Sequence, residues 1–345
     1  CINLILLDLI YKYCLIMKAL ILAAGKGSRL YPATKKTPKP LMPIAGRETL
    51  CYVIDEIIEN EITEIGIVVS EENIGEISIF TKRYYPEFKI SIILQQEQLG
   101  VAHAVKISKN FIKDDNFLLY LGDNLFENGI SKVVSKFKLN ENNIISIKSV
   151  PDPRKFGVAE INKNGNLNKI VEKPENPQSS LAVTGIYGFN NKIFDCIEKI
   201  SLSKRGEYEI TDAIKISLEV DDIVDTQIID GWWVDTGNIT DYLKANEYKL
   251  ISNNNPQDLE KINSQGTKID SFSYTSNNSE ILESQIINYT SIGSNVNISN
   301  SVIENCVILD ESEIKNYRLK NCILSKGTSL INTSPNRKII ENKII

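Results

Sequence analysis

Histidine is almost missing from this sequence and cysteine is sparse: of 345 residues, one is histidine, His103, and six are cysteine, with no C-x-x-C pair. A single histidine excludes a histidine-rich metal site and leaves no second histidine for a Ser-His-Asp triad elsewhere in the chain. Scattered cysteines form no zinc cluster and suit a reducing compartment. We therefore expect a cytoplasmic protein without a histidine or cysteine metal centre.

An excess of one charge and long apolar runs are also lacking. The net charge is −5 and no basic stripe is present, which argues against a nucleic-acid partner. Residues 1–16 are apolar, but Asp8 and Lys12 interrupt them, and a membrane-spanning helix needs ~20 apolar residues. The segment also lacks the features of a secretory signal. We interpret it as an extension upstream of Met17, with a membrane or interface anchor as the alternative, and we expect no membrane partner.

From Met17 onward, short apolar runs alternate with stretches of helical periodicity. The predicted strands are 17–23, 64–70, 89–95, 116–122 and 143–149. The first helical stretch has one apolar face, formed by Leu50, Val53, Ile54, Ile57 and Ile58. This alternation predicts an α/β domain with a mainly parallel sheet, in which ligands bind beyond the carboxyl ends of the strands.

The pattern changes after residue 150. The dipeptide Asn164-Gly165 predicts a hairpin turn. It is followed by helical periods near 191–200, 209–220 and 238–251, with a strand at 225–230. Residues 252–278 are rich in Asn, Ser and Gln and are expected to form a linker with a strand or two.

Beyond the linker, apolar residues recur about every six positions with two slips, which is typical of a parallel β-helix. They are Ile286, Ile292, Ile298, Val302, Ile308, Ile314, Leu319, Leu324 and Leu330. A loose β-rich tail is the alternative. The predicted parts are an extension 1–16, a main domain 17–251, a linker 252–278, a β-helix-like domain 279–331 and a tail 332–345.

The stretch 22–44, LAAGKGSRLYPATKKTPKPLMPI, follows the first predicted strand and is rich in small and basic residues. Glycine permits positive φ, so that successive backbone N–H groups can point into one concavity that binds phosphate. Arg29 adds a fork of donors and Lys39 a point charge. The stretch predicts a polyphosphate-binding loop; the alternative is a glycine turn with solvated basic residues.

Several motifs then resemble one known family in its order and near its spacing, over residues 17 to about 250. They are G-x-G-[ST]-R-L with P-K-P-L-x-P-I, LQQEQLGVAHAV (94–105), YLGDN (120–124), DPRKFGVAEI (152–161), VEKPENP (171–177), AVTGIYGF (182–189), RGEYEITDAI (205–214) and GWWVDTG (231–237). The family is that of the sugar-1-phosphate nucleotidylyltransferases, and the succession is most similar to the long-form glucose-1-phosphate thymidylyltransferases.

The resemblance implies a fold and a reaction. The fold is a Rossmann-like mixed, mainly parallel sheet of the nucleotide-diphospho-sugar transferase type, followed by a short left-handed parallel β-helix. The reaction transfers a thymidylyl group from dTTP to glucose 1-phosphate, giving dTDP-glucose and pyrophosphate. Because the sugar phosphate is already a nucleophile, catalysis depends on alignment and on cancelling charge between two anions. A homo-oligomer is also expected.

The resemblance further assigns roles to single residues. Asp123 and Asp235 match the ligands of Mg²⁺, whereas a lone aspartate after a strand is more often a cap or turn residue. The catalytic cations are Arg29, Lys39 and Lys173. The nucleotide-binding residues are Ala24, Gly25, Gly27, Ser28, Arg29, Gln95, Gly100 and Asp123; Gln95 matches the position that reads the pyrimidine. The sugar-phosphate-binding residues are Gly157, Glu172, Lys173, Val183 and Glu209.

Other interpretations remain open. Pro40 after Lys39 also occurs in uridylyl and guanylyl relatives, so UTP or another sugar phosphate is an alternative substrate. Some relatives carry an acetyltransferase β-helix, but these are expected to need a histidine there, and none follows His103. A non-catalytic regulatory subunit would be expected to lose the metal and phosphate residues, which are all present. We expect His103 to be a packed or supporting residue, and Trp233 to wall the site or pack in the core.

Overall fold

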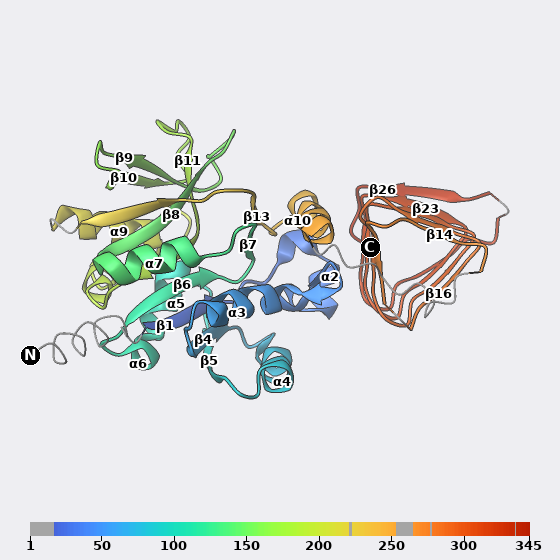
Figure 1. The fold of residues 1–345 in the computed structure, drawn as a ribbon, viewed down its shortest axis with the longest axis horizontal. Helices are drawn as coiled ribbons and strands as arrows, with labels where there is room; N and C mark the ends of the chain where they lie inside the picture. Colours follow the sequence, from blue (N-terminus) through green and yellow to red (C-terminus); the bar gives the residue numbers. More distant parts are fainter. Residues whose placement is uncertain (1–16, 221–222, 253–264, 277, 335) are drawn as a thin grey trace, which may run out of the picture. The chain divides into compact units, whose positions relative to one another are not determined.

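The computed structural model describes residues 17–220, 223–252, 265–276, 278–334 and 336–345 (Figure 1). The chain divides into two compact units. The first comprises Cys1–Gly25 and Val53–Trp233, and the second comprises Lys26–Tyr52 and Val234–Ile345. The predicted extension 1–16 and part of the predicted linker, 253–264, lie outside the described residues.

The first unit is built on a mixed, mainly parallel sheet. In the described part of the chain this sheet has nine strands, in the order β10-β9-β11-β6-β1-β4-β5, with β8 next to β11 and β12 next to β8. The parallel strands β6, β1, β4 and β5 form one half. The bounds are β1 (Met17–Leu22), β4 (Glu64–Val69), β5 (Lys89–Leu94), β6 (Asn116–Leu121), β8 (Asn143–Ser149), β9 (Gly157–Ile161), β10 (Leu167–Glu172), β11 (Leu181–Phe189) and β12 (Val224–Ile228). The predicted strands and the predicted hairpin are confirmed.

Helices pack against this sheet through apolar faces. On α3, four of the five predicted apolar-face residues are fully buried, and Ile58 is half-buried. α7 packs on β8 and β11, and α9 packs on β10. The bounds are α3 (Thr49–Glu59), α4 (Ile74–Tyr84), α5 (Val101–Ile107), α6 (Lys109–Ile112), α7 (Ser131–Asn140), α8 (Ile193–Ile197) and α9 (Ile210–Glu219), with the short strand β7 (Asn124–Phe126) after β6.

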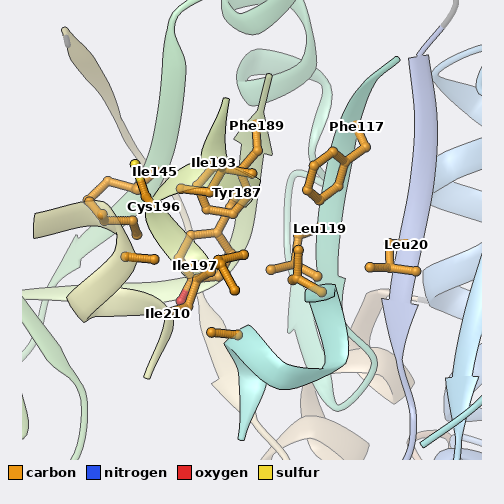
Figure 2. Close-up of a cluster of buried hydrophobic side chains, with 14 of the residues drawn as sticks. Leu20, Phe117, Leu119, Ile145, Tyr187, Phe189, Ile193, Cys196, Ile197 and Ile210 are labelled. Atoms are coloured by element: carbon orange, nitrogen blue, oxygen red, sulfur yellow. The ribbon is translucent and has the colours of Figure 1, made fainter. Parts of the chain in front are cut away.

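The core of the first unit lies where β1, β6 and β11 meet α8 and α9. Leu20, Phe117 and Phe189 come from three adjacent strands and are fully buried (Figure 2). The Phe117 ring lies 5.7 Å from that of Phe189 and 6.0 Å from that of Phe194. Because each such side chain removes a large apolar area from water, this cluster holds the strands whose ends carry the site.

The second unit contains the basic loop, one long helix and the C-terminal coils. Its first elements are η1 (Ser28–Leu30), α2 (Ala33–Lys36), η2 (Lys39–Leu41), β2 (Pro43–Ile44) and β3 (Arg47–Glu48), and α10 (Ile239–Ser252) comes after β13 (Trp233–Asp235). The fully buried Asn246 of α10 accepts from the Ala45 backbone N–H at 2.8 Å and donates to the Tyr289 carbonyl at 2.7 Å. This one amide therefore fastens the β2–β3 turn and the coils to α10.

The C-terminal strands form three parallel ladders, as expected of the predicted left-handed β-helix. They are β14 (Lys268–Ile269), β17 (Gln285–Ile287), β20 (Val302–Glu304), β23 (Tyr317–Lys320) and β26 (Lys338–Glu341); β15 (Tyr274–Thr275), β18 (Ser291–Ile292), β21 (Val307–Ile308) and β24 (Ile323–Leu324); and β16 (Glu280–Leu282), β19 (Asn297–Ser299), β22 (Glu313–Lys315) and β25 (Ser329–Ile331). The fold-class prediction is confirmed. The ladders include strands on both sides of the predicted range 279–331.

One predicted position in the coils is wrong. Ile303, not Val302, pairs with Ile286 and with Leu319, so successive coils advance by 17 and then 16 residues. Val302 pairs with Gln285 and Arg318 instead. Because side chains alternate along a strand, a shift of one residue moves a side chain to the other face. The fully buried Ile303 fills the core position that Val302 was expected to fill.

Asparagine at the corners of the coils explains the abundance of this residue in the C-terminal region. Asn300, Asn305, Asn316 and Asn321 all have positive φ, which asparagine tolerates better than other side chains with a Cβ. Their amides also stack between coils: the Asn305 Nδ2 donates to Asn321 Oδ1 at 2.8 Å, and the Asn321 Nδ2 donates to Asn342 Oδ1 at 2.9 Å. Each such corner is thus held by backbone preference and by a side-chain ladder.

Replacing Asn321 is expected to separate these two contributions. Asn321→Ala should lower the free energy of unfolding by about 1–3 kcal/mol, because it loses the ladder hydrogen bonds and places alanine at positive φ. Asn321→Gly should lose less, since glycine accepts this φ. Thermal unfolding followed by calorimetry measures both. An alanine variant as stable as the parent, or more stable than the glycine variant, would contradict this account of the corner.

The structure agrees with what the sequence lacks. In the described part of the chain the cysteines Cys51, Cys196, Cys306 and Cys322 are unbonded and buried. Across the same residues, no helix combines the length and the apolar character needed to cross a lipid bilayer.

Candidate active site

In the first unit, polar residues gather at the carboxyl edge of neighbouring parallel strands. Ala24 and Gly25 follow β1, Gln95 follows β5, and Asp123 follows β6. Gly122 is required for this arrangement, because a Cβ on it would lie 2.9 Å from the Leu22 carbonyl oxygen. The sheet topology thus brings these four predicted nucleotide-binding residues to one edge.

The side chain of Asp123 is held by the next residue. The Asn124 Nδ2 donates to Asp123 Oδ1 at 2.8 Å, and the Trp233 Nε1 donates to Asn124 Oδ1 at 2.7 Å. Gly185 leaves room for the Asn124 amide, since a Cβ there would lie 2.5 Å from Asn124 Cγ. The chain from Trp233 through Asn124 therefore orients the Asp123 carboxylate. Trp233 is half-buried and acts here as a hydrogen-bond donor, a role that neither sequence interpretation of it contained.

Around Gln95 the structure forms a compact cluster. Its side chain is buried, and its Nε2 lies 3.0 Å from His103 Nδ1 and 3.4 Å from the Gly100 carbonyl oxygen. His103 lies on α5, and its ring stacks on Tyr208 with centroids 6.4 Å apart. His103 is thus a packed residue with a hydrogen-bond partner of its own.

A second cluster is centred on the carboxylate of Glu172, at the end of β10. The Arg205 Nη1 lies 3.2 Å from its Oε1 and the Lys173 Nζ lies 3.5 Å from the same oxygen. The Thr211 hydroxyl donates to Oε2 at 3.1 Å. Two cations and a hydroxyl therefore fix Glu172, and the predicted pair Glu172–Lys173 is more ordered than a solvated loop pair.

Arg205 also contacts Glu209, which is buried. The Arg205 Nη1 lies 3.3 Å from Glu209 Oε1, which also accepts from the Ser203 hydroxyl at 2.9 Å. Burial raises the pKa of Glu209 above its ordinary value; the Ser203 hydrogen bond opposes the rise, the charge of Glu172 adds to it and Arg205 opposes it. Glu172 and Glu209 thus share one guanidinium.

The remaining predicted sugar-side residues lie beside this cluster. A Cβ on Gly157 would lie 2.9 Å from Thr211 Cγ2, 3.4 Å from Glu172 Oε2 and 3.5 Å from Val183 Cγ2. Gly157 and Val183 are both buried. The structure therefore brings all five predicted sugar-side residues into one neighbourhood, with glycine required at position 157.

One segment links the Gln95 cluster to the Glu172 cluster. Tyr208 donates its backbone N–H to the Leu99 carbonyl at 2.7 Å, and its own carbonyl accepts from the Ala102 N–H at 3.1 Å. Gly100 has φ +100°, and a Cβ there would lie 2.7 Å from the Tyr208 carbonyl oxygen. Glycine at position 100 thus serves the packing of residues 205–209, which carry both Arg205 and Glu209.

In the second unit, the basic loop is shaped by Gly27. This residue has φ +63° and begins η1, and a Cβ on it would lie 3.0 Å from Lys39 Cβ and from Thr34 Cγ2. The Thr34 hydroxyl donates to the Gly27 carbonyl at 2.8 Å. Gly25, at the end of the first unit, has neither a positive φ nor a close neighbour to its Cβ position, so only Gly27 has a conformation that needs glycine.

Also in the second unit, Arg29 and Asp235 meet at Gly237. A Cβ on Gly237 would lie 2.5 Å from Arg29 Nη2 and 2.9 Å from Asp235 Oδ1. Gly237 therefore allows the guanidinium and the carboxylate to approach one another. The exposed Ser28 and the half-buried Lys39 belong to the same unit, on either side of Arg29 in the sequence.

The chemistry of Asp123 and Asp235 suits magnesium better than a transition metal. No group of three or more His, Cys, Asp or Glu side chains among the described residues could hold an ion. Mg²⁺ is commonly bound through only one or two carboxylates, with substrate phosphates and water completing its octahedron. Each aspartate comes with or just after a strand and offers hard oxygen ligands, so both fit an ion of this kind.

Three residues of these clusters were not predicted from the sequence as site residues: Asn124, Arg205 and Gly237. All three stand inside quoted motifs, YLGDN, RGEYEITDAI and GWWVDTG. Arg205 follows a predicted helix by several residues and carries a charge in a loop, which usually indicates a solvated side chain. Only its distance to Glu172, far away in sequence, reveals its role.

Comparisons with known proteins agree with this fold and these clusters. The nucleotidyl transferase family model matches residues 18–251. The low-salt glycan biosynthesis nucleotidyltransferase Agl11 of Haloferax volcanii is 34% identical over 342 residues, covering 91% of this chain and 94% of that protein. A glucose-1-phosphate thymidylyltransferase of Streptomyces griseus is 33% identical over 307 residues, covering 87% and 86%.

A solved structure of a UDP-glucose pyrophosphorylase complexed with UDP-glucose has a TM-score of 0.62 and 25% identity, and it covers 69% of this chain and 99% of that one. The family match spans well over half of the chain, and the relatives match it nearly end to end. The chain therefore belongs to the nucleotidyl transferase family.

Proposed function

We propose that the chain transfers a thymidylyl group from dTTP to glucose 1-phosphate, with release of pyrophosphate and formation of dTDP-glucose. The observation that supports this best is the link between two clusters in the first unit. Gln95 and Gly100 are suited to a base, Glu172, Lys173 and Glu209 are suited to a sugar phosphate, and residues 205–209 join them. The similarity to the Streptomyces griseus enzyme supports the choice of both substrates.

The reaction needs alignment of two anions. An oxygen of glucose 1-phosphate attacks the α-phosphorus of the triphosphate in line with the departing pyrophosphate, and no general base is required. Lys173 is proposed to hold the attacking phosphate, because its ammonium lies next to Glu172, which is proposed to accept from the sugar hydroxyls. Arg29 and Lys39 are proposed to bind the triphosphate and to stabilise the leaving pyrophosphate, whose charge grows in the transition state.

Members of the family generally use a divalent metal, typically Mg²⁺. We propose that Asp123 and Asp235 hold it. A bound magnesium ion would supply charge neutralisation at the phosphates. The contribution of the chain is the hydrogen-bonded order of Asp123, which Asn124 and Trp233 maintain.

UTP is the second candidate nucleotide. The similarity to the UDP-glucose pyrophosphorylase favours it, and so does chemistry, since uracil presents the same N3–H and the same two carbonyl oxygens as thymine. The 5-methyl group is the difference between the two bases, and a pocket that gains only one methyl contact discriminates by about 10- to 200-fold.

We expect pyrophosphate release from dTTP and glucose 1-phosphate, and loss of this release when a chelator removes Mg²⁺. A coupled phosphate assay after pyrophosphatase, run with dTTP, UTP, dCTP and dGTP against a panel of sugar 1-phosphates, measures it. Activity should return when Mg²⁺ is added in excess of the chelator. Release with UTP but not with dTTP would replace the first candidate by the second. No release with any pair would leave the non-catalytic alternative.

A further inference from the structure

The amide nitrogen of Gln95 has an acceptor for each of its two hydrogens. Its Nε2 lies 3.0 Å from His103 Nδ1 and 3.4 Å from the Gly100 carbonyl oxygen. The side chain is 4% exposed, so water does not compete freely for this group. Within the described residues no protein donor lies within hydrogen-bonding distance of the Gln95 Oε1. That carbonyl oxygen is the part of the amide left for a ligand.

The orientation of this amide follows from its neighbours. A carbonyl oxygen such as that of Gly100 can only accept, so an amide turned by 180° would place one acceptor against another. His103 Nδ1 strengthens the choice, because in the neutral tautomer with its proton on Nε2 it accepts as well. Gly100 and His103 therefore select the orientation in which Gln95 Oε1 faces outward.

His103 is well placed to impose this selection. It lies on α5, which begins at Val101 directly after Gly100, and its half-buried ring stacks on Tyr208. Tyr208 is itself bound to Leu99 and Ala102 through its backbone. The imidazole is therefore held on a helix and against a fastened loop, and its Nδ1 points at the amide it orients.

An outward acceptor distinguishes pyrimidine bases by one atom. Thymine and uracil carry N3–H, a donor, whereas the N3 of neutral cytosine is an acceptor. A carbonyl oxygen opposite N3 bonds the first two bases and repels the third. When a polar group in a site is left without its partner, discrimination is much larger than that produced by a missing methyl group.

We propose that His103 is a positioning residue for base choice: by fixing the Gln95 amide with its carbonyl oxygen outward, it makes the site select bases that carry N3–H over cytosine. This inference rests on the proposed function, in which Gln95 faces the base. It deepens that function by assigning to the single histidine of the chain the rejection of cytidine nucleotides.

The test compares the parent with His103→Phe, His103→Asn and His103→Gln. Phenylalanine keeps the ring and removes the acceptor. Asparagine can place its Oδ1 where Nδ1 stood, since both atoms are the same number of bonds from the backbone. Glutamine reaches the position of Nε2 instead and serves as the matched control. The measurement is kcat/KM for dTTP, UTP and dCTP with saturating glucose 1-phosphate.

We expect the ratio of kcat/KM for dTTP over dCTP to fall about tenfold in His103→Phe, mostly through KM for the nucleotide. The ratio for dTTP over UTP should stay constant, because both bases carry N3–H. His103→Asn should recover most of the dTTP over dCTP ratio and His103→Gln should not.

The proposal is overturned if His103→Phe lowers kcat/KM for dTTP and dCTP equally, or leaves their ratio unchanged. If the phenylalanine variant does not fold, equal ratios in the asparagine and glutamine variants overturn it as well. A parent protein that turns over no nucleotide at all would instead refute the proposed function. The two failures are therefore distinguishable by the parent alone.

Discussion

Asp123→Asn is expected to lower the turnover number by about 10²-fold or more with dTTP and glucose 1-phosphate. The substitution keeps the size of the side chain, and its Oδ1 can still accept from Asn124, so the surroundings should not change. What it removes is the negative charge that we assign to magnesium binding. Steady-state kinetics at several Mg²⁺ concentrations measure this, and a higher Mg²⁺ requirement should accompany the loss.

A matched control is Asp195→Asn. Asp195 is exposed on α8, and we assign it no part in the site. This variant should keep the parent turnover and the parent Mg²⁺ requirement. Near-parental activity in Asp123→Asn would remove Asp123 from the mechanism, and an equal loss in both variants would point to a general effect of charge.

Local pattern was enough to predict the architecture of the first unit. The strands β1, β4, β5, β6 and β8 match the predicted runs to within one residue, because a strand buried on both faces needs a short continuous apolar run. The hairpin of β9 and β10 follows from Asn164-Gly165, whose glycine has φ +83°. These features depend on neighbours in sequence, so the sequence alone displays them.

Register in the coils is different, because it depends on how many residues a corner takes. The apolar period located the ladders but misplaced Val302 by one residue. Asparagine at positive φ makes compact corners, and a coil of 16 or 17 residues does not keep a strict six-residue count. A single corner is invisible in an averaged period.

The clusters of the site were predictable as residue types but not as contacts. Gln95, Glu172 and Glu209 could be named from their motifs, whereas the hydrogen bonds that orient them come from residues distant in sequence. Arg205 joins Glu172 to Glu209, and Trp233 reaches Asn124 from more than 100 residues away. His103 had no recognisable partner in the sequence, and the partner that the structure provides, Gln95, lies across a turn. Long-range pairing of this kind is a property of the folded sheet.

Glu172→Gln is expected to reduce kcat/KM for glucose 1-phosphate by about 10²-fold, because it weakens two charge-assisted contacts at once. The carboxylate holds the guanidinium of Arg205 and the ammonium of Lys173, and glutamine has the same shape without the charge. Lys173 would then be free to move away from the attacking phosphate. Initial rates at varied glucose 1-phosphate and saturating dTTP measure the effect.

The comparison with Glu160→Gln decides whether this loss belongs to the site. Glu160 lies on β9 of the same hairpin and pairs with Lys169 at 3.2 Å, well within the ordinary range of weak surface pairs. That variant should keep the parental kinetics. In Glu172→Gln the KM for dTTP should change little, because the Gln95 cluster does not contain Glu172. If KM for dTTP rose as much as KM for the sugar phosphate, Glu172 would be supporting the fold of both clusters through Arg205, and its assignment to the sugar hydroxyls would be wrong.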